Sequence, residues 1–149
     1  MDIFDKIDYT TARMVGLFPK FYHLLRQILK DINDIDESEI VILQLIRAKG
    51  GKAKRPIIWG ELAIDSKKYA YKATHLIQHG LIQSQRQGRE SIDILTEQGN
   101  QKFEEIKSKL ELFISSMFSL LNDEERKTVI AAIEILDTLS RRMEDNNDQ

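Results

Sequence analysis

Residues 65–96, DSKKYAYKATHLIQHGLIQSQRQGRESIDILT, place a helical pattern directly before a short alternating one. Apolar residues recur at three- and four-residue spacing over 66–79, which predicts a helix, and Gly80 follows as its C-terminal cap. After a Gln-Gly pair, Ile92 and Ile94 alternate with polar residues, which predicts the second strand of a β-hairpin. The stretch therefore predicts one helix followed at once by one hairpin.

On a helical wheel, the predicted helix has an apolar and a polar face. The apolar face consists of Tyr69, Ala70, Ala73, Leu76 and Ile77. The opposite face holds the basic and hydrogen-bonding side chains Lys68, Tyr71, Lys72, His75 and His79. Arg86 and Arg89 flank the predicted hairpin tip. Such an arrangement is typical of a helix in the DNA major groove with a basic hairpin beside it, although a solvated helix face would show the same pattern.

The chain has 149 residues and a formal net charge of -2, but its charges are unevenly distributed. The window 49–89 holds nine basic and two acidic residues, whereas the rest of the chain is strongly acidic. A basic centre between acidic ends suits a local phosphate-binding surface. The alternative is a basic surface that serves solubility alone.

The segments before residue 65 are predicted to be mainly helical. Residues 1–17 form an arm interrupted by Gly16, and Pro19 opens a helix that ends near residue 31. Asp36 and Glu39 have the spacing of a capping box, which starts a helix that ends at the glycines 50–51. We expect 52–55 to be a basic connector, followed by a short helix that begins at a proline.

The segments after the window are also predicted to be helical. Thr96 caps a long helix, and Asn122 or Asp123 starts a final one with apolar residues at helical spacing. A polar tail from 144 to 149 is expected to fray. The fold class is therefore mainly α with one small β-hairpin.

Several function classes lose support from composition. Without cysteine the chain has no disulfide, thiolate nucleophile or cysteine-ligated zinc site. His75 and His79 are four residues apart, but no further ligand completes a metal site on that face. No phosphate-cradling loop or catalytic constellation is present, so we expect neither an enzyme nor a cofactor. No apolar segment is long enough for export or membrane insertion, and a cytoplasmic protein is expected.

The order of elements and three sequence tags resemble the MarR family of bacterial transcriptional regulators. The tags are Ile35-Asp36 with Glu39-Ile40 and Leu43, then Gly80-Leu81-Ile82, and Leu95-Thr96-Glu97-Gln98-Gly99. The resemblance covers roughly residues 18 to 143, and a gapless alignment puts the family's recognition helix on 66–79. This chain departs from the family in a shorter segment between 82 and 95 and in having Gln87 at the usual wing aspartate. Arg89 falls on the position of the wing arginine.

The resemblance implies a winged helix-turn-helix protein with N- and C-terminal dimerisation helices. It divides the chain into an arm and first dimerisation helix (1–34), a DNA-binding lobe (35–96) and C-terminal dimerisation helices with a polar tail (97–149). The implied partners are a second copy of the chain, a pseudo-palindromic DNA operator and a small aromatic or anionic effector. The apolar stripes of the outer helices independently favour a dimer, because one small lobe cannot cover them.

The function predicted is a sequence-specific DNA-binding regulator, a dimeric repressor modulated by a small ligand. The alternative is a dimeric winged-helix module that binds a protein and has lost operator binding. The predicted DNA-binding residues are Lys54, Arg55, Lys67, Lys68, Tyr71, Lys72, His75, Arg86 and Arg89. The predicted effector-binding residues, aromatic or basic side chains of the first helix, are Tyr9, Arg13, Tyr22 and His23.

Overall fold

The computed structural model describes residues 3–30 and 34–147. The chain divides into two compact units, Met1–Lys109 and Leu110–Gln149. The first unit contains α1 (Ile3–Leu29), α2 (Glu37–Ala48), β1 (Lys52–Lys54), α3 (Arg55–Glu61), α4 (Ser66–Gln78), β2 (Ile82–Gln87), β3 (Glu90–Leu95) and the start of α5 (Glu97–Phe118). The second contains the end of α5 and α6 (Asp123–Asn147). The division into 1–34, 35–96 and 97–149 stays a prediction.

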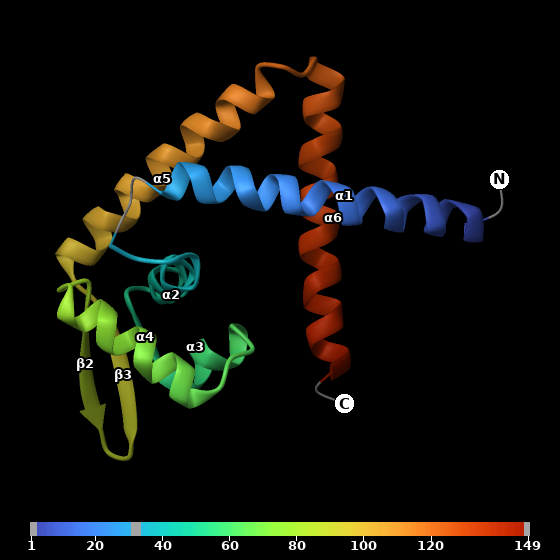
Figure 1. Ribbon diagram of the computed structural model, residues 1–149. Coiled ribbons are helices and arrows are strands. Elements are labelled where there is room, and N and C mark those ends of the chain that lie inside the picture. Colours follow the sequence, from blue (N-terminus) through green and yellow to red (C-terminus); the bar gives the residue numbers. More distant parts are fainter. Residues whose placement is uncertain (1–2, 31–33, 148–149) are drawn as a thin grey trace. The chain divides into compact units, whose positions relative to one another are not determined.

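The lobe formed by α2, α3, α4 and the sheet has its own apolar core. Side chains from α2, α3 and α4 are completely buried in it, among them Ile42, Leu43, Ile46, Ile58, Tyr69, Ala73 and Leu76. In Figure 1 the three helices gather on one side and the β2–β3 hairpin extends away from them beside α4. Mainly α architecture with one hairpin is confirmed, in the order of a winged helix.

Local capping interactions fix the boundaries of these helices. Asp36 and Glu39 form the predicted capping box at the start of α2, with hydrogen bonds of 2.9 and 3.1 Å between side chains and backbone amides. The Asn122 carboxamide oxygen accepts from the backbone amide of Glu125 at 2.9 Å, one residue before α6 begins. The predicted helix start at 36 is therefore confirmed, and of the two predicted starts of the final helix, Asn122 and Asp123, the structure has Asn122 as the capping residue.

The sheet has one strand more than the sequence predicted. Its order is β1-β3-β2, all antiparallel, with Lys52 opposite Ile94 and Ile82 opposite Leu95. The expectation of a basic connector at 52–55 was wrong for its first three residues. Ala53 is buried between two outward lysines, and this alternation is too short and too polar to predict a strand from the sequence. The strand β1 forms backbone hydrogen bonds with the edge of β3 that β2 leaves open.

Helix α1 is continuous where the sequence predicted an arm over 1–17, interrupted by Gly16, and a separate helix starting at Pro19. Both residues lie inside one helix of 27 residues. The apolar positions before and after Pro19 are in phase, with Met14, Phe18 and Phe21 on one stripe, so one unbroken helix presents a single surface. The predicted polar tail is also helical through 147, because no proline or glycine stops it.

The close packing around Gly99, in the first turn of α5, explains why this position three residues after Thr96 is a glycine. A Cβ atom there would lie 2.0 Å from the carbonyl oxygen of Leu81 and 2.8 Å from Leu95 Cδ1. Thr96 closes the same junction, since its hydroxyl donates to the carbonyl of Gly80 at 2.6 Å. The start of α5 thus packs directly on the backbone that ends α4.

We expect Gly99→Ala to lower the free energy of unfolding by about 1–3 kcal/mol, the usual cost of overpacking. Urea denaturation monitored by circular dichroism measures this change. The matched control is Gly60→Ala in α3, where nothing lies within 4 Å of the added methyl group. Equal stability of the two variants would contradict the close approach of α5 to Leu81.

Candidate nucleic-acid interface

Helix α4 is positioned by its N-terminal cap and by one buried face. The Asp65 carboxylate accepts from the backbone amide of Lys68 at 2.7 Å, and Gly80, with φ of +70°, ends the helix. Tyr69, Ala73 and Leu76 are fully buried. Because these three residues fix the rotation of the helix about its axis, the opposite face is turned to solvent.

That solvent face differs from the one predicted on the helical wheel. Its exposed residues are Lys67, Lys68, Tyr71, Thr74 and Gln78, and we call this set the α4 outer face. Tyr71 is 79% exposed. Thr74 and Gln78 were missed because they are uncharged, although their spacing of seven and eleven residues from Lys67 places them on the same face. Lys67 and Lys68 have no side-chain partner within the described part of the chain.

Lys72 and His75, predicted on the outer face, instead contact α2. Lys72 Nζ donates to Asp36 Oδ2 at 2.8 Å, and its side chain is only 12% exposed. His75 Nδ1 is hydrogen-bonded to Oε2 of Glu39, whose side chain is buried. Burial opposes ionisation of Asp36, but hydrogen bonds from Lys72 and from the backbone of Glu39 lower its pKa below the ordinary value. These contacts dock α4 on the start of α2, and the Lys72–Asp36 contact weakens as the pH falls through the depressed pKa of Asp36.

Arg55, another predicted DNA-binding residue, is part of a buried polar cluster. Its Nε donates to both carboxylate oxygens of Asp93, at 3.1 Å each, and Asp93 is completely buried in β3. The Tyr69 hydroxyl donates to the same carboxylate at 2.6 Å. Burial, and then the Asp93 carboxylate, raise the pKa of Tyr69, so the hydroxyl keeps its proton and stays a donor. Sequence reasoning missed Asp93 because it occupies a polar position of an alternating strand.

The β2–β3 hairpin has the predicted two arginines near its tip. Gln87 pairs with Glu90, so the turn consists of Gly88 and Arg89, with the positive φ of +63° at the glycine. Arg86 and Arg89 are exposed and have no ion pair with any residue that the structure describes. Lys54 on β1 is instead paired with Glu90 at 2.9 Å, both side chains being about half exposed.

The predicted effector-binding residues lie along α1 and do not converge within one chain. Tyr9 and His23 are separated by about 21 Å along the helix axis at the usual rise per residue. Arg13 stacks over the Tyr9 ring, with Cζ 5.1 Å from its centroid. Tyr22 is stacked with Arg26 in the same manner, at 5.7 Å. The single chain therefore holds two separate arginine–tyrosine pairs.

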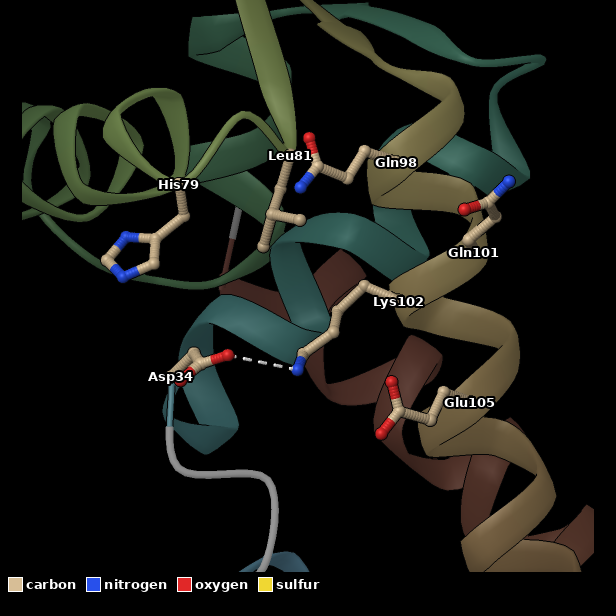
Figure 2. Close-up of a pocket in the computed structure, with 7 residues that line it drawn as sticks. All are labelled: Asp34, His79, Leu81, Gln98, Gln101, Lys102 and Glu105. Atoms are coloured by element: carbon tan, nitrogen blue, oxygen red, sulfur yellow. Dashed lines mark hydrogen bonds and ion pairs between the residues drawn. The ribbon is translucent and has the colours of Figure 1, made fainter.

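A cavity of about 340 Å³ opens between the end of α4 and the start of α5 (Figure 2). Its lining residues are Asp34, His79, Leu81, Gln98, Gln101, Lys102 and Glu105. Lys102 is paired with Asp34 at 3.2 Å, and the cavity contains acidic and basic groups in similar number.

No cluster of three metal-ligating side chains occurs in the described ranges 3–30 and 34–147. Within those ranges, no helix has the length and apolar character to cross a bilayer.

Three helices followed by a two-stranded wing, with long helices outside this lobe, define a winged helix-turn-helix protein. Comparison with solved structures gives the same result. A MarR transcriptional regulator from Methanosarcina mazei is 17% identical with a TM-score of 0.72, over 91% of this chain and 92% of that one. The YusO protein from Bacillus subtilis is 19% identical with a TM-score of 0.68, over 95% and 99% of the two chains.

A third similar structure is BpsR from Bordetella bronchiseptica, described by the regulation of its DNA binding by 6-hydroxynicotinic acid. It is 19% identical with a TM-score of 0.67, over 84% of this chain and 98% of that one. No protein-family model and no curated protein matches the sequence. The fold of this chain is the MarR-like winged-helix fold.

Proposed function

We propose that the protein is a sequence-specific DNA-binding transcription regulator that inserts α4 into the major groove. One observation carries this proposal. Four exposed basic residues of α4 and the hairpin have no ion pair within the described part of the chain, namely Lys67, Lys68, Arg86 and Arg89. Lys54, Arg55 and Lys72 are instead each paired with an acidic side chain. A solvated face kept basic for solubility would not require this separation of paired from unpaired cations.

In this proposal the α4 outer face contacts the major groove and the wing contacts the adjacent minor groove. Lys67 and Lys68 bind phosphates, and Tyr71 contacts a base edge or a thymine methyl group. Arg86 and Arg89 reach toward the minor groove from the hairpin. Four residues that the sequence predicted as direct DNA contacts are Lys54, Arg55, Lys72 and His75. In this proposal they do not bind DNA but hold the lobe together through their acidic partners.

The regulatory part of the proposal is repression by promoter occupancy, relieved by a small aromatic or anionic ligand. The support is the likeness to the BpsR structure, whose DNA binding is described as regulated by 6-hydroxynicotinic acid. Because the arginine–tyrosine pairs of α1 do not meet within one chain, a pocket built from them requires a second copy. Titrating aromatic carboxylates against the DNA complex tests this part, and loss of binding is the expected result.

The DNA-binding proposal is tested by enriching genomic fragments on the purified protein and measuring affinity for a selected duplex at two salt concentrations. We expect affinity to fall steeply between about 50 and 200 mM salt, with the selected duplex preferred over an unrelated one throughout. Absence of any enriched sequence, together with weak binding to both duplexes, would favour the protein-interaction module instead.

We also propose a homodimer, and a prediction follows from the exposed apolar residues of α6. Ile133, Leu136 and Met143 are more than half exposed in the single chain and lie on one stripe. Sedimentation should therefore give about twice 17.3 kDa. Ile133→Glu should shift the protein toward monomers, whereas Lys127→Glu, an exposed change on the same helix, should not. A folded wild-type monomer at micromolar concentration would contradict the dimer.

A further inference from the structure

Asp93 is the most deeply buried charged residue of the described chain. Glu39, at 5% exposure, is the other buried charged residue in the described ranges, and Asp93 has no exposed surface at all. An isolated charge in such a position is very costly, so its hydrogen-bond donors must stay in place. Those donors are Tyr69 from α4 and Arg55 from the first turn of α3, 24 and 38 residues away in sequence. One carboxylate therefore ties the middle strand of the sheet to both helices.

We propose that Asp93 is a positioning residue for DNA recognition, which fixes the orientation of α4 relative to the wing through Tyr69. This inference rests on the proposed DNA-binding function. Tyr69 directly follows Lys67 and Lys68 of the outer face, and Asp93 lies on β3, the strand that follows the wing turn. The hydrogen bond thus connects the two parts of the lobe that would enter adjacent grooves.

The position of Asp93 on β3 gives small rotations a large effect at the wing tip. Arg89 is four residues from Asp93, or about 13 Å along an extended strand. A rotation of about 10° around Asp93 therefore moves the tip by roughly 2 Å, and displacements near 1 Å already disturb a binding site. Apolar packing alone resists such a rotation weakly, because it has no preferred direction, whereas a carboxylate with two donors has a defined geometry.

The surroundings of Tyr69 hold its ring as well as its hydroxyl. Trp59 packs edge-on against the ring at 6.1 Å between centroids, and the Arg55 guanidinium lies 5.8 Å from the ring centroid. Tyr69 is therefore surrounded by α3 on one side and bonded to β3 at its end. Replacing it with phenylalanine removes only the directional bond and keeps the ring.

The test compares Tyr69→Phe with Ile46→Val, which removes one methylene group from a fully buried site in α2, a helix that supplies no donor to Asp93 among the described hydrogen bonds. Both variants and the wild type are assayed below their melting temperatures against a selected duplex and an unrelated one. We expect Tyr69→Phe to lower the ratio of the two affinities by about tenfold, the equivalent of one lost base contact, with affinity for the unrelated duplex unchanged. Ile46→Val should leave the ratio unchanged.

A second variant, Asp93→Asn, keeps an acceptor for the Tyr69 hydroxyl and serves where Tyr69→Phe loses its fold. For Asp93→Asn the ratio of selected-duplex to unrelated-duplex affinity should fall less than for Asp93→Leu, which offers the Tyr69 hydroxyl no acceptor. An unchanged ratio in Tyr69→Phe, or an equal loss in Ile46→Val, would show that the cluster acts only on stability and would overturn the inference. Should the wild type prefer no duplex, the DNA-binding proposal itself fails and this inference fails with it. The two failures are therefore distinguishable.

Discussion

Replacing Arg55 with methionine should lower the free energy of unfolding by about 3–5 kcal/mol, the range found when one partner of a buried ion pair is removed. The Asp93 carboxylate would remain fully buried with the Tyr69 hydroxyl as its one remaining side-chain donor among the described residues. Methionine keeps most of the volume of the arginine stem, so the loss reports the charge and not a cavity. Chemical denaturation of the purified variant measures it.

Two comparisons show whether the buried pair is the cause. Lys54→Met, one residue earlier, breaks the half-exposed pair with Glu90 and should cost about 0–1 kcal/mol. The double variant Arg55→Met with Asp93→Leu removes both charges and should recover part of the lost stability, because only the Tyr69 hydroxyl then lacks its acceptor. A double variant no more stable than Arg55→Met would contradict the explanation. In that case the contact of the Arg55 guanidinium with the Tyr69 ring would be the larger contribution.

Local chemistry made much of the fold predictable from the sequence. The capping pairs at 36 and 122, the glycine after α4 and the β2–β3 hairpin each depend on a few neighbouring residues, and all are present in the structure. Taken together, these local signals predict the MarR-like order of helices and strands. Where the sequence misled, as at Pro19, a local break signal was outweighed by an apolar stripe that continues in phase across it.

The candidate site was less predictable, because a basic residue does not show in the sequence whether it has an acidic partner. Lys72 and Lys68 are equivalent in charge and lie on one helix, yet only Lys72 reaches a carboxylate of α2. Asp93 was hidden for the same reason, since its partners come from elements far away in sequence. Pairings over 24 to 38 residues depend on tertiary packing, which periodicity alone does not give.

The α4 outer face should separate into residues that recognise sequence and residues that anchor the backbone. Tyr71→Ala with Thr74→Ala removes two uncharged, exposed side chains from the middle of this face, and we expect both to contact bases if α4 lies in the major groove. Each base contact is worth about 1–3 kcal/mol, so together they should cost the selected duplex about 2–6 kcal/mol and leave an unrelated duplex nearly unaffected. Fluorescence anisotropy with both duplexes measures the two affinities.

Lys67→Ala with Lys68→Ala should have the opposite signature, because phosphate contacts carry no sequence information. Both duplexes should bind more weakly by a similar factor, and the dependence of log affinity on log salt should become shallower by about two units. Lys20→Ala with Lys127→Ala is the control, since it removes the same charge from α1 and α6, outside the interface. If that control lowers the salt dependence equally, net charge and not α4 governs binding. If neither outer-face variant changes either affinity, α4 does not enter the groove, and the protein-interaction alternative is the better account of the fold.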